Sequence, residues 1–276
     1  PRRNAAVNKS WLHNDTRLLY RQLAENRLLG AQVDGQITGL ARGYEAAAER
    51  LQKARRIALV ASGHLTNEDN AALLGLAETL GDRAELFFGS WLPVGEPDGI
   101  ARSGDPVANR RGCELLGLRD NLDELVERAG EFDCLFVLGH DLWGADADRA
   151  KALETIAERI VCASWIDASV AQATVALGMR CWAEVRGTMV NCQDRVQRMQ
   201  ACPVSPNDDL DAPWRLLVRL SGLACDKPLP LTSEVDCWKL VRQRVPALAG
   251  TTYRRIGPLG CTLAECESTA AVPAEA

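Results

Sequence analysis

The chain contains 276 residues, of which 47% are hydrophobic and 25% charged, the composition of an ordinary globular protein with one large or two modest domains. Its formal net charge is −5 and no concentrated basic face is visible, which argues against nucleic acid as a partner. No apolar run approaches the roughly 20 residues that a membrane-spanning helix needs, so we expect no direct membrane insertion.

The N-terminal segment, residues 1–43, has no long apolar period and is predicted to be a connecting segment. Its basic start is not followed by an apolar stretch, so we expect no cleavable signal peptide. Because the chain starts with Pro1 and not with Met, we expect a processed or truncated product, or a piece of something longer.

Helices and short apolar strands alternate between residues 44 and 180. The predicted helices are 44–55, 67–80, 122–128 and 146–158, and the predicted strands are 57–61, 84–88, 134–138 and 160–163. Thr66 is the predicted N-cap of the second helix, with Asp69 completing a variant capping box, and Gly81 is the predicted end. A long loop rich in Gly, Pro and Asp is predicted over 89–112. The alternation predicts βαβ units, and hence a Rossmann-like α/β domain with a doubly wound, mainly parallel sheet.

The pattern changes in the C-terminal third of the chain. Residues 181–267 are predicted to form a smaller irregular and helical region. It begins with irregular strands and turns over 180–200 and continues with helices over 213–220 and 234–244. Residues 268–276 are small and polar and are predicted to be a flexible tail.

Ten cysteines is a high number, but their spacing is not that of a metal or cluster site. No two are separated by only two residues, as in zinc knuckles and ferredoxin-type runs, and the closest pair is Cys261 and Cys266. Cys134 and Cys162 lie in apolar strand-like runs, where cysteine behaves as a small buried hydrophobe. We therefore expect reduced structural thiols. The alternatives are a cluster or metal completed by distant cysteines, and disulfides.

The loops that follow the predicted strands are the first place to look for a ligand, because doubly wound sheets bind ligands at the carboxyl ends of their strands. The loop over 62–67 has one glycine and lacks the Gly-x-Gly-x-x-Gly cradle for a pyrophosphate, although the helix N-terminus behind it could hold an anion. His140 and Asp141 follow the third strand, where a carboxylate could orient an imidazole for acid–base work. No nucleophile or metal partner accompanies them, and the favoured interpretation is that they stabilise a loop.

Four stretches carry a resemblance to a known family. They are PRRNAAVNKSWLHNDTRLLYRQLAENRLL (1–29), RRIALVASGHLTNEDNAALLGLAETLG (55–81), DPVANRRGCELLGL (105–118) and AEVRGTMVNCQDRVQRM (183–199). In this order they resemble the large G subunit of NADH-quinone oxidoreductase (complex I), in its molybdopterin-oxidoreductase-like part downstream of the iron–sulfur region. The last stretch is the most specific, because it resembles the superfamily's Ala-Glu-x-x-Gly-Thr-x-x-Asn-x-x-Gly-Arg-x-Gln segment. The resemblance implies a molybdopterin-oxidoreductase-like fold.

The chain also departs from this family. His13 stands where relatives carry a cysteine that closes a [4Fe–4S] site in some members, and Thr16 replaces a glycine. The family's other cluster ligands would precede Pro1. Asp194 replaces the glycine of the Asn-x-x-Gly-Arg turn, so we expect the backbone of that turn to differ. We therefore predict no catalytic, cofactor-binding or metal-binding residue in this chain.

Together these observations predict a non-catalytic structural subunit or domain of a complex-I-like NADH:quinone oxidoreductase, or of a related NAD-linked hydrogenase or formate dehydrogenase, with its cofactor site lost. The resemblance implies that iron–sulfur clusters, FMN and NADH are held by partner subunits, in a cytoplasmic complex that reaches the inner membrane only through those partners. The alternatives are an active molybdopterin or iron–sulfur electron-transfer subunit, and a small-molecule or nucleotide-binding module around His64 and His140.

Overall fold

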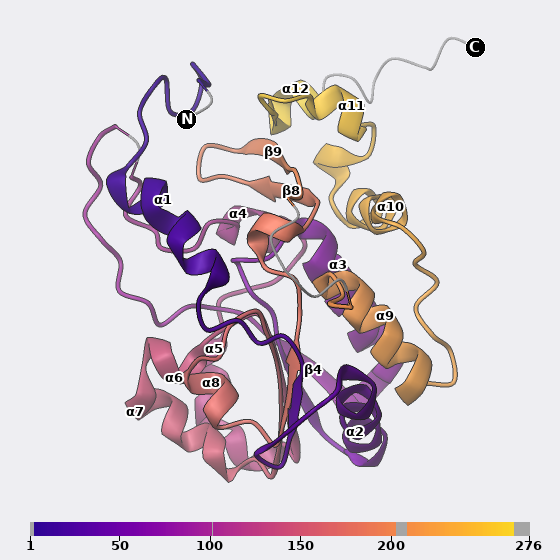
Figure 1. The fold of residues 1–276 in the computed structure, drawn as a ribbon. Coiled ribbons are helices and arrows are strands. Elements are labelled where there is room, and N and C mark those ends of the chain that lie inside the picture. Colours follow the sequence, from indigo (N-terminus) through magenta and orange to yellow (C-terminus); the bar gives the residue numbers. More distant parts are fainter. Residues whose placement is uncertain (1–2, 101, 203–208, 268–276) are drawn as a thin grey trace.

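The computed structural model describes residues 3–100, 102–202 and 209–267 (Figure 1). Its centre is a seven-stranded sheet with the order β2-β1-β7-β6-β5-β3-β4. These strands are β1 (Ala31–Val33), β2 (Gln36–Thr38), β3 (Ile57–Val60), β4 (Ala84–Phe87), β5 (Cys134–Leu138), β6 (Glu158–Ala163) and β7 (Val175–Gly178). Strands β3 to β7 run parallel, whereas β1 pairs antiparallel with β7 and β2 pairs antiparallel with β1 at the edge of the sheet.

Helices cover both faces of this sheet, which confirms the predicted doubly wound α/β fold (Figure 1). One face carries α2 (Leu40–Lys53), α3 (Asn67–Leu80) and α9 (Pro213–Ala224), and the other carries α5 (Leu122–Glu127), α6 (Leu142–Ala145), α7 (Ala147–Ala150) and α8 (Ala168–Ala171). Successive side chains of a strand point to opposite faces, so Phe136 of β5 packs with the first helix layer and Leu135 with the second. Strand β5 is apolar along its whole length, because a central parallel strand is buried on both faces.

A second sheet, with the order β10-β9-β8, lies beside the N-terminal end of α3. Its strands are β8 (Gly187–Val190), β9 (Arg195–Met199) and β10 (Cys261–Thr262), and a third apolar cluster joins them to α10 (Glu234–Arg244), α11 (Tyr253–Ile256) and α12 (Leu263–Glu267). The remaining helices are α1 (Asn14–Leu18) and α4 (Arg110–Leu115). Short 3-10 turns cover Leu19–Ala24, Gly81–Arg83, Ala129–Glu131, Lys151–Thr155, Trp182–Glu184 and Pro246–Leu248. The predicted irregular strands over 180–200 thus form an ordered hairpin.

The predicted helices and strands agree best with the structure where the capping residues or the apolar pattern lie within the element itself. The capping box of α3 is present: the Asp69 N–H donates to the Thr66 hydroxyl, and the Asp69 carboxylate accepts the Thr66 N–H. The single helix predicted over 146–158 was wrong, because α7 ends at Ala150 and is followed by a 3-10 turn. Glu158 is already in sheet register with Cys134, so the chain must extend before that point.

The β1–β2 hairpin was missed, although Asp34 and Gly35 carry a recognisable signal for it. Their φ values of 49° and 77° are those of a two-residue hairpin turn, for which Asp-Gly is a favoured sequence. Through this hairpin, residues 31–38 become part of the central sheet. The predicted flexible tail over 268–276 lies outside the described residues. In the part of the chain that the structure describes, no helix is both long and apolar enough to cross a membrane.

Candidate functional site

A pocket of about 480 Å³ opens at the carboxyl ends of β3, β5, β6 and β7, and is called the edge pocket below. The chain proceeds from β3 outward to β4 and then returns to β5 on the other side of β3. This reversal is the topological switch point at which doubly wound folds bind ligands. His64, Gly139, Ser164 and Met179 line the pocket from the four strand-end loops. The fold therefore forms a hollow at the expected place.

The charge of the edge pocket is negative. Its charged lining residues are Glu25, Asp141 and Asp167, and none of its lining residues in the described chain is Lys or Arg. Burial, together with the nearby charge of Asp141, raises the pKa of Asp167 to about 6. Trp165 and Trp182 add aromatic surface. Such a lining opposes the negatively charged phosphates of a nucleotide or of a pterin dinucleotide.

The two strand-end residues that sequence analysis singled out both have structural roles. The His140 ring donates from Nε2 to the Gly89 carbonyl at 3.1 Å, and burial lowers its pKa to about 4. Asp141 caps α6 by accepting the Gly144 N–H at 3.0 Å, and also accepts the Ser169 N–H at 2.9 Å. His140 and Asp141 thus bond to neighbouring backbone groups and not to each other, which supports the interpretation that they stabilise the loop.

The N-terminal turn of α3, which could have held an anion, is occupied by the protein itself. Glu68 is fully buried there, and its carboxylate accepts the Thr188 N–H at 2.7 Å and the Tyr253 hydroxyl at 2.9 Å. Burial raises the pKa of Glu68 to about 7. Strand β8 approaches so closely that a Cβ on Gly187 would lie 2.7 Å from atoms of both Thr66 and Glu68. No space is left at this helix end for a ligand phosphate.

Three of the four stretches that resemble the superfamily meet in one buried hydrogen-bond network. The Asn67 side chain donates to the Thr188 hydroxyl at 3.0 Å and accepts from the Asn109 side chain at 3.0 Å. Asn109 in turn accepts the Val190 N–H at 2.8 Å. These stretches stand out in the sequence, but the network between them was not predicted from it. The spacing of Asn67, Asn109 and Thr188 along the chain contains no signal for the network. In the folded protein these residues hold α3 to the β8–β9 hairpin.

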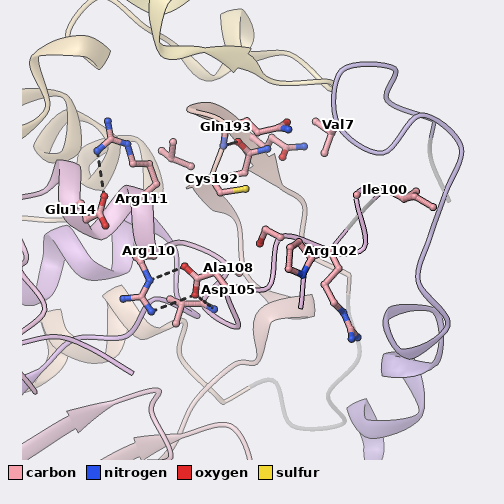
Figure 2. Close-up of a pocket in the computed structure, with 17 residues that line it drawn as sticks. Val7, Ile100, Arg102, Asp105, Ala108, Arg110, Arg111, Glu114, Cys192 and Gln193 are labelled. Atoms are coloured by element: carbon pink, nitrogen blue, oxygen red, sulfur yellow. Dashed lines mark hydrogen bonds and ion pairs between the residues drawn. The ribbon is translucent and has the colours of Figure 1, made fainter. Parts of the chain in front are cut away.

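A second hollow, called the loop pocket below, has a volume of about 620 Å³ (Figure 2). It lies between the 89–109 loop, the N-terminal segment near Val7, and the β8–β9 turn with Cys192 and Gln193. Three arginines line it, and each is paired with a carboxylate: Arg102 with Asp15 at 3.0 Å, Arg110 with Asp105 at 2.7 Å, and Arg111 with Asp194 at 2.6 Å. Their positive charge is thus already neutralised within the chain.

The residues that depart from the family pattern have simple surroundings. His13 precedes α1, and its Nδ1 lies 3.3 Å from the Asp15 carboxylate. Asp194 has a φ of 56°, in the left-handed region that glycine favours and aspartate tolerates, so its substitution does not by itself require a different turn.

Most cysteines lie in the interior, including Cys134 and Cys162 in their predicted strands. Burial raises the pKa of Cys134 to about 12 and also removes its sulfur from solvent, as expected for an unreactive packing thiol. Among the described residues, no group of three or more His, Cys, Asp or Glu side chains is placed to hold a metal ion.

About half of the chain is similar to curated proteins of one kind. The chain is 30% identical over 139 residues to an F420-dependent formate dehydrogenase 2 subunit alpha of Methanococcus maripaludis. This sequence is similar to formate dehydrogenase alpha subunits. A second alpha subunit of that organism is 25% identical over 142 residues, and one of Methanocaldococcus jannaschii is 25% identical over 140. The matches cover about half of this chain and only about a fifth of each relative.

No protein-family profile matches the chain. Among solved structures, the formyltransferase/hydrolase complex (FhcABCD) of Methylorubrum extorquens with methylofuran contains a similar chain. The identity is 13% and the TM-score 0.39, over 70% of this chain and 98% of that one. This likeness is too distant to bear on function. The curated relatives thus support a relationship to subunits of oxidoreductases, without distinguishing which part of their chemistry is shared.

Proposed function

We propose that this chain is a structural subunit or domain of an oxidoreductase complex related to formate dehydrogenases, and that it binds no molybdopterin itself. The observation that carries the proposal is the charge of the edge pocket. A bound dinucleotide would place a pyrophosphate near the strand ends, where cations or free N–H groups must receive it. The pocket instead presents Glu25, Asp141 and Asp167.

Two further features support a lost cofactor site. The glycine of the first strand-end loop, Gly63, serves packing, because a Cβ there would lie 2.1 Å from the side chain of Val107. The α3 N-terminus is filled by Glu68 and Asp69, both fully buried. The residues present therefore do not fit the group that the resemblance implies. What remains is the α/β fold, whose surfaces we propose contact partner subunits.

The proposal also concerns which oxidoreductase complex this chain belongs to. The curated relatives favour a formate-dehydrogenase type among the three parents that the sequence predicts. A complex-I-like quinone reductase remains a prediction from motif order, as does a cytoplasmic complex that contacts the inner membrane through partners. In either complex, iron–sulfur clusters and the electron-carrying cofactors would belong to other subunits.

The experiment has two measurements. The chain is tagged in its native host, the complex is purified under mild conditions, and its subunits are identified by mass spectrometry. Molybdenum, tungsten and iron are then quantified in the complex and in the chain separated from it. We expect co-purifying redox subunits, with metal in the complex and well below stoichiometric amounts in this chain. Stoichiometric molybdenum or tungsten in the separated chain would overturn the cofactor-free proposal, and recovery without partners would overturn the structural role.

The electrostatic reason is tested separately with GDP as a probe of dinucleotide binding. We expect no rise in melting temperature, because only a ligand that binds the folded state raises it. Glu25→Lys places a cation at the pocket, whereas Glu127→Lys makes the same charge change on α5 and serves as the matched control. If charge excludes phosphates, only the first variant should show an increased GDP-dependent shift. A clear shift with the unmodified chain would contradict the argument.

A further inference from the structure

Cys261 and Cys266 form a thiol pair at the C-terminal end of the described chain. Their Sγ atoms lie 2.7 Å apart, inside the separation that two non-bonded sulfur atoms normally keep, so the fold places the two side chains face to face. A disulfide needs an S–S distance of about 2.05 Å and side chains that already face each other. Only a small movement of one sulfur therefore separates this contact from a bond.

The local backbone holds the two cysteines in place. Cys261 is in β10 and is paired with Val196 of β9, and Cys266 is in α12. The turn between them is fixed by the Thr262 N–H, which donates to the Glu265 carboxylate at 2.7 Å, and by the Glu265 N–H, which donates to the Thr262 hydroxyl at 3.2 Å. The contact is thus a property of an ordered strand–helix junction.

The two thiols differ in access to solvent. Cys261 is partly exposed, whereas Cys266 is buried in the apolar cluster under α12. A small-molecule disulfide can therefore reach Cys261 first, and Cys266 is placed to resolve the product. A reversible dithiol–disulfide couple has this arrangement, in which an accessible thiol reacts first and a neighbouring thiol resolves the product.

We propose that Cys261 and Cys266 form a reversible intramolecular disulfide by exchange with a small-molecule disulfide such as oxidised glutathione. The Cys261 thiolate attacks one sulfur of the oxidant and releases one thiol, which leaves a mixed disulfide. The Cys266 thiolate then attacks the Cys261 sulfur and releases the second thiol. Two protein S–H groups are oxidised, one S–S bond forms, and the external disulfide is reduced to two thiols by the same two electrons.

The bond would join β10 to α12 beside the wall of the loop pocket. The Leu263 N–H donates to the Asp194 carbonyl at 2.9 Å, which ties the junction to the β8–β9 turn. Asp194 is the residue that pairs with Arg111 in that pocket. Oxidation of the pair is therefore expected to rigidify the β8–β9 turn as well as the junction itself.

The test is mass spectrometric and uses the intact chain. Trypsin cleavage after Arg255 leaves a peptide, 256–276, that contains both cysteines of the pair and no other. The reduced chain is incubated with oxidised glutathione, the free thiols are blocked with N-ethylmaleimide, and the peptide is analysed. Burial and the contact with Cys266 raise the pKa of Cys261 to about 12, so the incubation must be long. Exposed Cys192 and Cys202 report that the oxidant is active.

We expect the peptide to lose two hydrogen atoms and to accept no blocking group until a reductant is added. Cys261→Ser should abolish this product, and the Cys192→Ser/Cys202→Ser double variant should leave it unchanged. The proposal is overturned if both thiols remain blockable after Cys192 and Cys202 have fully reacted. A stable mixed disulfide on Cys261, with Cys266 still free, would also overturn it. The unmodified chain decides the outcome even if a variant fails to fold.

Discussion

Substitution of Glu68 by Gln should make the stability of this protein less dependent on pH. Burial raises the pKa of Glu68 from its ordinary value of 4.5 to about 7. Between these two pH values the folded protein binds more protons than the unfolded chain, so the free energy of unfolding decreases as pH rises. The stability that Glu68 contributes is fully present below pH 4.5 and is lost as the pH rises through about 7.

The size of the effect follows from the same pKa values. One pKa unit of difference between folded and unfolded states corresponds to about 1.4 kcal/mol, so the loss attributable to Glu68 is about 3 kcal/mol. A glutamine keeps the shape and most of the network. Its oxygen can accept the Thr188 N–H, and its amide can donate to the Tyr253 hydroxyl, which can then give its own hydrogen to the Glu234 carbonyl, 3.0 Å away.

The assay is urea unfolding at several pH values from about 5 to about 8, with the free energy obtained by linear extrapolation. We expect the unmodified chain to lose stability over this range and Glu68→Gln to lose distinctly less. A residual slope will remain, because burial also raises the pKa of Asp69 to about 6. Glu127→Gln, on the exposed side of α5, is the control and should keep the full slope. Identical pH profiles for Glu68→Gln and the unmodified chain would refute the assignment of the titration to Glu68.

Two further substitutions test the packing. Arg27 and Glu184 form a 2.6 Å ion pair whose side chains are only 3% and 5% exposed, so Arg27→Met should destabilise by about 3–5 kcal/mol in urea unfolding. Arg27→Met/Glu184→Gln should recover part of this loss, and a double variant as unstable as the sum of both single variants would contradict coupling. Gly187→Ala should cost about 1–3 kcal/mol, because the added methyl group meets α3, whereas Gly130→Ala, with open space around it, should be nearly neutral. Equal melting temperatures for the two alanine variants would show that the close approach of β8 to α3 is not required.

Much of the local structure could be predicted because its causes lie close together in the sequence. Strand β5 was predicted with its observed bounds, since a continuous apolar run is what a strand buried on both faces needs. Helix α3 was predicted from Thr66 to Gly81, because its capping box and its terminal glycine lie within the segment itself. The β1–β2 hairpin could have been found in the same way from Asp34 and Gly35.

The candidate site was decided by packing between distant parts of the chain. Asn109 and Thr188 lie 42 and 121 residues after Asn67 along the chain. No local pattern indicates that the three residues share a hydrogen-bond network. The raised pKa of Glu68 also depends on burial, which a sequence does not specify.

The sequence by itself determined the α/β class, most elements, and the family resemblance. The tertiary structure decided that carboxylates gather at the edge of the sheet and that the motif residues are used for packing. It also decided that the sulfur atoms of Cys261 and Cys266 come into contact. The physical reason is that propensity and periodicity act over a few residues, whereas electrostatic environment and contact depend on which elements the folded chain brings together.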